Sequence, residues 1–369
     1  MNIIHVITHG GWAGSETIAA EIANEQARRG HNITVILRKH EGFKERDIVT
    51  KFHSDISIFW VKQNETHPDN QIKTLLKNEQ FVNKVHQADV LHAHLPYGCL
   101  LGKLLKDTLL LNFLICVSMH VRFHPLYYLA DKLFTVAKWQ RLEVPNDYTG
   151  EVSVIENFLC PSSLNNTKRL KVFKNKHHIS DGFKYIVYIG RLDLVKGPDV
   201  LIRAFNKVNP AGYKLLIVGD GAEAKSLKSI ATENVIFTGK ILDASFVLEL
   251  ADIAVVPSRF ESFGLILLEV INAKKRVIAT NIPSFREILG DGDYFFDNES
   301  VNSLAGKIEQ YINFPMIGYA EEDTLAGFSL EFSSNKLEEA YFVEKSNMEC
   351  VGIIEQSSAV TETEVANNV

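Results

Sequence analysis

Two carboxylates, Glu261 and Glu269, bracket a Ser-Phe-Gly turn that lies between an apolar run and a helical pattern. A turn of this kind joins a strand to a helix start, where free N–H groups attract phosphate at the ligand-binding edge of an α/β sheet. The two carboxylates also invite a glycosidase interpretation, in which they would act as acid and nucleophile. A retaining hydrolase needs its carboxyl groups roughly 5 Å apart, whereas helical spacing would separate these two by about 12 Å. The spacing therefore argues against a hydrolase.

A second loop carries two cations. The strand pattern at 184–189 is followed by Gly190, Arg191 and Lys196, and Gly197 precedes the next helical pattern. Arginine offers a forked hydrogen-bond donor and lysine a point charge, a combination that suits a diphosphate. The alternative is a solvated turn. This loop is the main candidate for a phosphate site.

The first strand pattern, at 2–8, runs into a turn that contains Gly10 and Gly11. Glycines at a strand–helix turn allow the backbone to approach a phosphate or a sugar, although such a turn is often only a turn. A site for NAD would place an acidic residue at the end of the second strand. Arg38 occupies that position, which disfavours NAD and leaves NADP as a minor option.

Histidines follow the next two strand patterns. His92 and His94 lie on the same face of a strand end and could share a metal, but no third ligand is evident nearby in the sequence. The better interpretation is that they line a cleft or have a structural role. His120 follows the strand pattern at 113–118, and it too could line a cleft or have a structural role. Asp291 and Asp293 are better explained as a turn than as a metal site, so no metal is predicted.

Strand and helix patterns alternate through both halves of the chain, as they do in doubly wound parallel sheets. With 369 residues, two domains are expected. We predict an N-terminal Rossmann-like domain over residues 1–165 and a C-terminal one over 175–330, joined by a polar, basic linker. A helix at 331–345 is expected to pack back on the N-terminal domain, and residues 346–369 are expected to be a disordered tail.

The composition is that of an ordinary α/β protein, with a net charge of −6 that does not favour nucleic acid as a partner. Four scattered cysteines indicate a reducing compartment. There is no signal-peptide pattern, and the longest apolar run is about half a membrane span. These features predict a cytoplasmic protein. Basic residues gather at 28–51 and could face an anionic membrane or form a solvated surface.

Taken together, these stretches resemble the family 4 retaining glycosyltransferases, which have the GT-B fold of two facing Rossmann-like domains around a cleft. The matching stretches are H-G-G-W-A-G-S-E, L-H-A-H-L-P, S-M-H, G-R-L-D-L-V-K-G-P-D-V-L-I-R-A-F, V-G-D-G-A-E, E-S-F-G-L-I-L-L-E and I-P-S-F-R-E-I-L. They extend over about residues 3–343. The G-R-x(4)-K-G loop combined with E-x(7)-E is far more specific than either motif alone.

The resemblance implies transfer of a sugar from a nucleotide-sugar to an acceptor hydroxyl, with retained configuration and without a metal or other cofactor. Arg191 and Lys196 would hold the donor diphosphate and stabilise the leaving charge. Glu261 would bind the hydroxyls of the donor sugar, and His120 would contact the sugar near its anomeric carbon. These four residues are the catalytic candidates.

The remaining donor-binding residues implied by the resemblance are Gly10, Gly11, Gly190, Ser262, Phe263, Gly264, Leu265 and Glu269. Among them, Glu269 would bind the ribose hydroxyls. On the acceptor side the candidates are Trp12 and His94, and Trp12 has simple packing as its alternative. One departure concerns the helix after Glu269, which often ends in glycine in the family but has Lys274 at that place.

The function expected from the sequence is a hexosyltransferase that uses a UDP-sugar to build a cell-surface glycan such as lipopolysaccharide or capsule. Its acceptor would be a glycan or a lipid-linked glycan, and the protein would be peripheral on the inner face of the cytoplasmic membrane. One alternative is a non-catalytic nucleotide-sugar-binding protein with the same fold. Another is an oxidoreductase that uses NADP.

Overall fold

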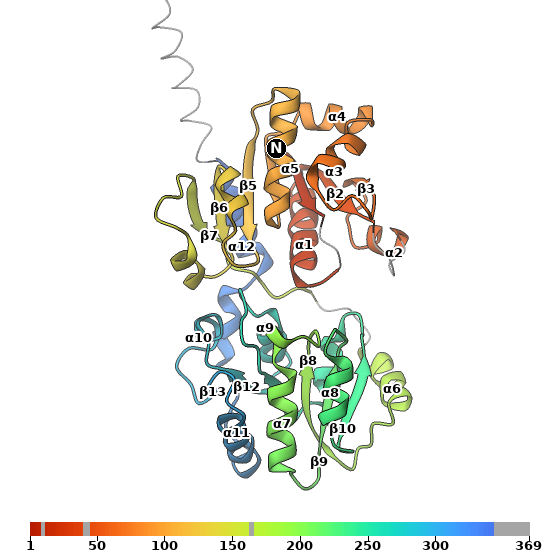
Figure 1. The fold of residues 1–369 in the computed structure, drawn as a ribbon, viewed down its shortest axis with the longest axis vertical. Coiled ribbons are helices and arrows are strands. Elements are labelled where there is room, and N and C mark those ends of the chain that lie inside the picture. Colours follow the sequence, from red (N-terminus) through yellow and green to blue (C-terminus); the bar gives the residue numbers. More distant parts are fainter. Residues whose placement is uncertain (9–11, 40–44, 162–165, 343–369) are drawn as a thin grey trace, which may run out of the picture.

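The computed structural model describes residues 1–8, 12–39, 45–161 and 166–342. Two α/β domains lie one above the other in Figure 1, with the N-terminal domain at the top. Each is built on one parallel sheet, which confirms the predicted pair of doubly wound domains. Gly10, Gly11 and the tail from residue 343 onward lie outside the described residues.

The N-terminal domain is built on a seven-stranded sheet. Its strands are β1 (Asn2–Ile7), β2 (Asn32–Arg38), β3 (Ser57–Val61), β4 (Val90–Ala93), β5 (Leu114–Met119), β6 (Lys132–Thr135) and β7 (Glu151–Val154). Its helices are α1 (Gly14–Arg28), α2 (Glu45–Val49), α3 (Pro68–Leu75), α4 (Glu79–His86) and α5 (Pro96–Leu109), with the 3₁₀ turns η1 (Pro125–Leu129) and η2 (Trp139–Glu143).

The C-terminal domain is built on a six-stranded sheet. Its strands are β8 (Lys184–Ile189), β9 (Tyr213–Val218), β10 (Val235–Gly239), β11 (Ile253–Val256), β12 (Arg276–Thr280) and β13 (Phe295–Phe296). Its helices are α6 (Asn166–Lys176), α7 (Pro198–Val208), α8 (Ala224–Ile230), α9 (Leu265–Asn272), α10 (Pro283–Leu289) and α11 (Val301–Asn313), with the 3₁₀ turns η3 (Leu194–Lys196), η4 (Ala244–Leu250) and η5 (Glu322–Gly327). The last helix of the described residues is α12 (Leu330–Phe342).

Strand order reverses once in the centre of each sheet. The first sheet has the order β3-β2-β1-β4-β5-β6-β7, and the second has the order β10-β9-β8-β11-β12-β13. The chain therefore turns to opposite sides after β1 and β4 in the first sheet, and after β8 and β11 in the second. In open α/β sheets, ligands bind outside the carboxyl ends of the strands at such a reversal.

The strands at these reversals are apolar because helices cover both faces of the sheet. In β1 every residue from Ile3 to Ile7 is buried, and His5 is the one polar member of that run. In β11 all four residues are buried. The polar loops that follow these strands are consequently held on a rigid edge.

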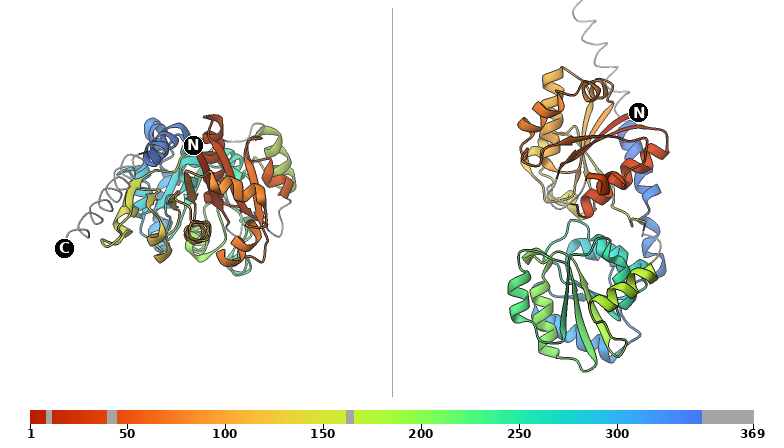
Figure 2. Two further views of the ribbon diagram at one scale, coloured as in Figure 1. Left: turned by 90° about the horizontal axis from the view of Figure 1, so that it is seen from above. Right: turned by 90° about the vertical axis from the view of Figure 1, so that its right-hand side faces the viewer.

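Helix α12 leaves the C-terminal domain and packs on the N-terminal one, as the blue ribbon shows in Figure 2. Tyr341 is buried there, and Ser333 donates a hydrogen bond to the carbonyl oxygen of Glu156 at 2.7 Å. Lys132, which is fully buried in β6, donates to the carbonyl oxygen of Ala340 at 2.6 Å. The end of the described chain is thus part of the first domain's core.

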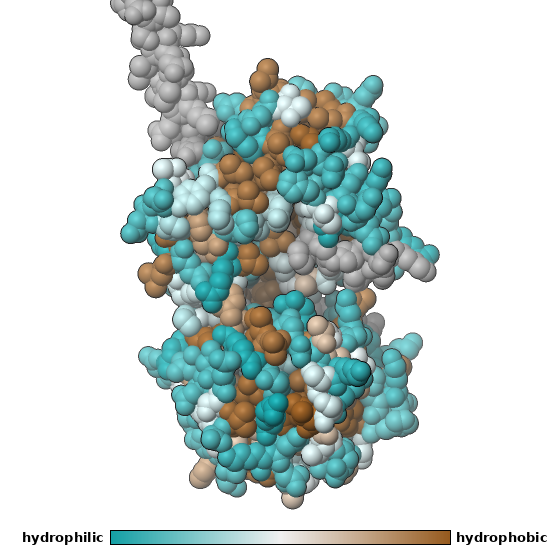
Figure 3. Space-filling model, viewed as in Figure 1, coloured by the Kyte–Doolittle hydropathy of each residue, from teal (hydrophilic) through white to brown (hydrophobic). Residues whose placement is uncertain are grey.

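Figure 3 shows that the surface narrows to a waist between the two domains. The turn η2 of the N-terminal domain contacts helix α10 of the C-terminal domain. The backbone N–H groups of Lys138 and Trp139 donate to the two carboxylate oxygens of Glu287 in α10, at 2.7 and 3.0 Å. The guanidinium of Arg122 lies over the ring of Phe260, 4.2 Å from its centroid. Within the described residues, no helix is long and apolar enough to cross a membrane.

Candidate functional site

The predicted site residues that the structure describes follow the strands on either side of the two reversals. Gly190 and Arg191 come directly after β8, and Glu261 comes after β11. In the N-terminal domain, His94 follows β4, and His120 follows β5 one strand further along. Because the strands of each sheet are parallel, these residues gather at one edge of their domain. That arrangement is the basis of the candidate site.

Lys196 and Glu261 form the centre of the C-terminal half of the site. The Lys196 Nζ lies 2.5 Å from Glu261 Oε1, and the Ser258 hydroxyl donates to the same oxygen at 2.9 Å. The Lys196 side chain is 23% exposed and that of Glu261 is 12% exposed, so both are largely buried but still reach solvent. A carboxylate held in this way still has its second oxygen as an acceptor for a ligand hydroxyl.

The loop before Lys196 is closed by Asp193. Its carboxylate accepts a hydrogen bond from the backbone N–H of Lys196 at 3.0 Å and lies 3.2 Å from the Arg191 guanidinium. The Arg191 side chain is 66% exposed, which leaves its fork available to an incoming anion. The loop therefore presents two cations, of which Lys196 is held in place by hydrogen bonds and Arg191 is exposed.

Gly197 allows this loop to turn into α7. Its φ is +65°, and a Cβ at this position would lie 2.0 Å from the carbonyl oxygen of Pro257. Any other residue would therefore displace the segment after β11, on which Ser258 and Glu261 lie. The glycine fixes the approach of the two loops that supply Lys196 and Glu261.

The segment before α9 is held from both sides. Gly264 has a φ of +106° at the helix N-cap, and its Cα faces the ring of Phe285. Phe263 is buried and packs edge-on against Phe328, so its side chain belongs to the core. The carbonyl oxygen of Ser262 accepts a hydrogen bond from the Trp139 indole at 3.0 Å. Leu265 lies against Gly14 of the opposite domain.

Glu269 lies in the middle of α9. Burial raises the pKa of its carboxyl to about 7, and the nearby charge of Asp243 acts in the same direction. A carboxyl with this pKa exchanges its proton near neutral pH, so a ligand that donates hydrogen bonds to its ionised form would draw the proton off. Glu269 is thus the titrating group of this half of the site.

Four histidines form the corresponding part of the N-terminal domain. His5, His92 and His94 are buried, and the partly exposed His120 lies beside them. The ring nitrogens of His5 and His94 are 3.0 Å apart, and those of His94 and His120 are 3.4 Å apart. Burial lowers the pKa of His5 and of His120 to about 4. The cluster is therefore neutral at physiological pH.

The nitrogens of His5, His92 and His94 lie close enough together, within 4.8 Å, to suggest a metal site. Their hydrogen bonds argue against one. His5 also contacts Gln26 at 2.8 Å, and His92 contacts the hydroxyls of Ser118 and Tyr341 at 2.9 and 2.7 Å. Both nitrogens of each ring are therefore engaged, and a metal would have to break several buried hydrogen bonds.

Of the two acceptor-side candidates, His94 is buried and Trp12 is partly buried. His94 is 2% exposed, and its Nδ1 lies beside Nε2 of the partly exposed His120. Trp12 packs edge-on against Phe52, and the Lys51 ammonium lies over its ring. This geometry agrees with the packing alternative for Trp12.

Other charged residues singled out in the sequence are largely paired. Asp293 contacts Lys307 and Gln310, which is consistent with a structural turn. The ion pairs of the basic segment 28–51 lower the free positive charge it would offer to a membrane; they are Arg28–Glu25, Arg29–Glu25, Arg29–Glu338, Lys39–Glu45 and Arg46–Asp47. Lys44 lies outside the described residues.

Several residues of the site were not anticipated from the sequence. Ser258, Asp193 and Trp139 each hold a predicted residue or loop through the hydrogen bonds described above, and Glu287 in turn accepts from the backbone N–H of Trp139. Gln26 lies in α1 and is fully buried against His5. A signal for Gln26 was present, because a polar residue occupies the buried face of an amphipathic helix, but its partner could not be inferred without the fold.

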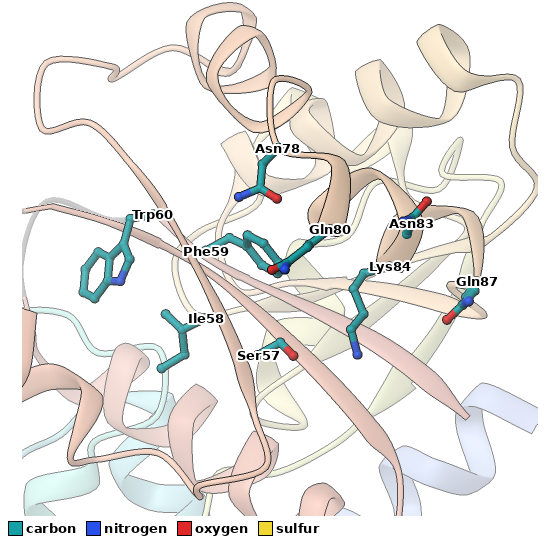
Figure 4. Close-up of a pocket in the computed structure, with 9 residues that line it drawn as sticks. All are labelled: Ser57, Ile58, Phe59, Trp60, Asn78, Gln80, Asn83, Lys84 and Gln87. Carbon is teal, nitrogen blue, oxygen red and sulfur yellow. The ribbon is translucent and has the colours of Figure 1, made fainter.

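A groove of about 680 Å³ lies elsewhere, along the edge strand β3 and helix α4 (Figure 4). It is lined by Ser57, Ile58, Phe59, Trp60, Asn78, Gln80, Asn83, Lys84 and Gln87. None of the predicted site residues contributes to it. Since β3 is at the outer edge of its sheet, the groove is separate from the strand reversal.

Comparisons with known proteins identify the family of this chain. The model of glycosyltransferase family 4 matches residues 12–146, and the model of glycosyl transferases group 1 matches residues 171–321. An uncharacterized 41.2 kDa protein in the cps region of Klebsiella pneumoniae is 30% identical over 198 residues. That match covers 52% of this chain and 53% of the relative, so it spans about half of either protein. An uncharacterized glycosyltransferase of Methanocaldococcus jannaschii is 25% identical, covering 67% of this chain and 72% of its own.

Among solved structures, the Anabaena protein HepE in complex with UDP and glucose superposes with a TM-score of 0.76. The superposition covers 92% of this chain and 99% of HepE. Sequence identity is 17%, so this likeness establishes the GT-B fold alone. The two family models match different halves of the chain, and together they include both loops of the site. The chain therefore belongs to the group 1 and family 4 glycosyltransferases, a family of transferase enzymes with the GT-B fold.

Proposed function

We propose that this protein is a retaining glycosyltransferase that moves a hexose from a UDP-sugar to a hydroxyl of a cell-surface glycan or a lipid-linked glycan. The observation that carries the proposal is the arrangement of Arg191, Lys196 and Glu261. Two cations and a carboxylate lie in the loops that follow β8 and β11, the neighbouring strands at which the strand order reverses. A sugar diphosphate presents the matching groups, which are two phosphates and a polyhydroxylated ring.

In this proposal Arg191 and Lys196 bind the diphosphate and stabilise its charge as it leaves. These cations supply the positive charge that a metal ion provides in other transferases, so no metal is needed. Glu261 accepts hydrogen bonds from hydroxyls of the sugar through the oxygen that Lys196 and Ser258 leave free. Glu269 accepts hydrogen bonds from the ribose hydroxyls in its ionised form.

Transfer then takes place on the face of the sugar from which the diphosphate leaves. The acceptor hydroxyl attacks the anomeric carbon of an oxocarbenium-like ion pair, and the leaving phosphate takes its proton. The anomeric configuration is thereby retained without a protein nucleophile. His120, which is neutral because burial lowers its pKa to about 4, contacts the sugar as a hydrogen-bonding group.

Two of the similar proteins support the choice of donor and acceptor. HepE binds UDP and glucose in its solved complex, which supports a UDP-hexose donor. The relative in Klebsiella pneumoniae is encoded in the cps region, which supports a glycan of the cell surface as the acceptor.

The test is a panel of UDP-, GDP- and ADP-sugars, scored for thermal stabilisation and for slow hydrolysis of the donor. A ligand that binds the folded chain raises the melting temperature by mass action, and we expect the UDP-sugars to do so most strongly. Hydrolysis should persist in EDTA. The panel is repeated with Lys196→Ala and Glu261→Ala, both of which should abolish turnover.

Unchanged turnover in both variants would contradict the proposal. Stabilisation by a UDP-sugar with no turnover toward water or any acceptor glycan would instead identify a nucleotide-sugar-binding protein.

A further inference from the structure

A line of hydrogen-bonded side chains runs from helix α1 to His120 through the first domain. The Gln26 Oε1 lies 2.8 Å from His5 Nε2, and His5 Nδ1 lies 3.0 Å from His94 Nε2. The line continues from His94 Nδ1 to His120 Nε2 at 3.4 Å. Its inner members are buried and only His120 is partly exposed. We call Gln26, His5, His94 and His120 the histidine relay.

The relay has a direction because each imidazole in it is neutral. Burial lowers the pKa of His5 to about 4 and that of His94 well below its ordinary range. A neutral imidazole has one N–H donor and one acceptor nitrogen. If the Gln26 oxygen accepts from His5 Nε2, then His5 Nδ1 must accept from His94, and His94 Nδ1 must accept from His120. The orientation of the Gln26 amide, at the far end of the relay, thus determines the tautomer of His120.

The structure has Gln26 in this orientation. Its amide oxygen lies 2.8 Å from His5 Nε2, and its amide nitrogen has no hydrogen-bond partner among the described residues. Beside the relay, the Tyr341 hydroxyl lies 2.7 Å from His92 Nδ1, and His92 Nε2 lies 2.9 Å from the Ser118 hydroxyl.

We infer that Gln26, His5 and His94 are positioning residues that hold His120 as its Nε2–H tautomer and so leave Nδ1 as a hydrogen-bond acceptor for a hydroxyl of the donor sugar. The inference rests on the proposed function in one respect, namely that His120 meets the sugar. The tautomer itself depends only on the relay. Tyr341 in helix α12 lies beside the relay, with its hydroxyl 2.7 Å from His92 Nδ1, and is not a member of it.

The groups around His120 are compatible with this assignment. His94 faces it from β4, and the Glu16 carboxylate in α1 is the nearby charge that opposes the lowering of its pKa. The Glu16 carboxylate also accepts a hydrogen bond from the backbone N–H of Ala13 at 2.8 Å, which holds it at the start of its helix. His120 consequently remains neutral, and its hydrogen-bonding pattern is determined by His94 and the rest of the relay.

The first test measures the tautomer directly. The full chain is labelled with ¹⁵N in its histidine rings, and long-range ¹H–¹⁵N spectra distinguish a protonated from an unprotonated ring nitrogen. His120→Phe assigns the His120 signals. We expect His5, His94 and His120 to carry their protons on Nε2 in the unaltered protein. In Gln26→Met, which removes the terminal acceptor at similar volume, the Nδ1 signal of His120 should move toward the protonated position.

The second test asks whether the tautomer matters for transfer. Outer-shell partners that orient metal-bound histidines are typically worth about 10–100-fold, and by analogy we expect kcat of Gln26→Met to fall by about tenfold with the donor KM unchanged. Gln71→Met is the matched control, because Gln71 is equally buried but donates to the carbonyl oxygen of Glu65 away from the relay. It should leave both kcat and the His120 signals unchanged.

If Gln26→Met does not fold, His5→Phe breaks the next link and should give the same two changes. An unchanged His120 tautomer in the folded variants would overturn the inference, and so would a changed tautomer with an unaltered kcat. If the unaltered protein transfers no sugar from any donor, the proposed function fails, and the spectra alone still decide whether the relay sets the tautomer of His120.

Discussion

The two halves of the site use opposite kinds of chemistry. The C-terminal half is a network of charges, in which Lys196, Glu261, Asp193 and Arg191 are linked by ion pairs and Glu269 titrates near neutral pH. The N-terminal half is a buried and neutral set of histidines with amide and hydroxyl partners. A charged group binds the diphosphate strongly whichever sugar the donor carries. A neutral hydrogen-bonding group is suited to orienting the sugar itself. We therefore expect the first half to determine donor binding and the second to determine transfer.

The largest effect is expected at Lys196, because a charge-assisted hydrogen bond to the leaving phosphate strengthens as the charge develops. Lys196→Met should lower kcat/KM for the donor by about 10²–10³-fold, as loss of an electrostatic stabiliser does elsewhere. The measurement is initial-rate kinetics with the best UDP-sugar of the panel. Lys207→Met is the control, since Lys207 is an exposed residue at the far end of α7. If Lys207→Met lost as much kcat/KM as Lys196→Met, the loss could not be assigned to the charged half of the site.

The next effect concerns the backbone that brings the two loops of the charged half together. Gly197→Ala introduces a Cβ at positive φ and against the Pro257 carbonyl, so the free energy of unfolding should fall by more than about 3 kcal/mol. Gly212→Ala is the matched control, because Gly212 has a φ of +78° but no atom within 4 Å of its Cβ. It should lose only about 1–2 kcal/mol. Equal losses in urea unfolding would show that the close approach carries no cost.

The pH dependence of donor binding separates the two halves further. The pKa of Glu269 is raised to about 7, so its protonated form dominates below that pH, and ionisation must accompany the binding of ribose hydroxyls. The Kd for a UDP-sugar should therefore fall by up to about tenfold per pH unit as the pH rises toward 7, and then level off. Calorimetric titration measures it, and Glu269→Gln should remove the dependence. A change of Kd centred near pH 4 would implicate the histidines instead.

The same shift has a consequence for the ligand-free protein. Because the folded pKa of Glu269 lies above its unfolded value of 4.5, the folded chain binds the proton more tightly. The contribution of this group to stability is therefore present at low pH and is lost as the pH rises from about 4.5 to about 7.

The smallest effect is expected at the end of α9, where this chain departs from its family. Lys274 has a φ of +53°, a left-handed conformation that favours glycine, and its side chain is exposed. Lys274→Gly should raise the free energy of unfolding by about 0.5 kcal/mol without changing transfer. Asn272→Gly, in the last turn of the same helix, should instead be slightly destabilising. A loss of transfer in Lys274→Gly would show that the helix end takes part in the charged half.

The charged half could be predicted from the sequence more completely than the neutral half. Arg191, Lys196 and Glu261 stand in short motifs after clear strand patterns, so their placement required only the rule that parallel strands end at one edge. Lys274 at a helix end was likewise recognised as a departure, and its positive φ gives that departure a physical meaning.

The neutral half depends on contacts between residues far apart in the chain. Histidines at strand ends could be recognised, but the sequence did not show that His5 lies against His94, or that Gln26 and Tyr341 complete the network. The strand β3 was also missed, since its five residues follow a polar loop and show no regular alternation. Long-range hydrogen bonds between polar groups leave no periodic pattern in a sequence, so only the fold could bring them together.

The central claim is that the charged half binds the nucleotide and the neutral half acts in transfer. It is tested most directly by measuring UDP binding calorimetrically and product formation in parallel for Lys196→Met and His120→Phe. A charge-assisted hydrogen bond contributes about 1.5–3 kcal/mol, so Lys196→Met should weaken UDP binding by about 10–100-fold and also lose transfer. His120→Phe should bind UDP as the unaltered protein does and still lose transfer. UDP binding that is lost in His120→Phe, or that is kept in Lys196→Met, would contradict the account.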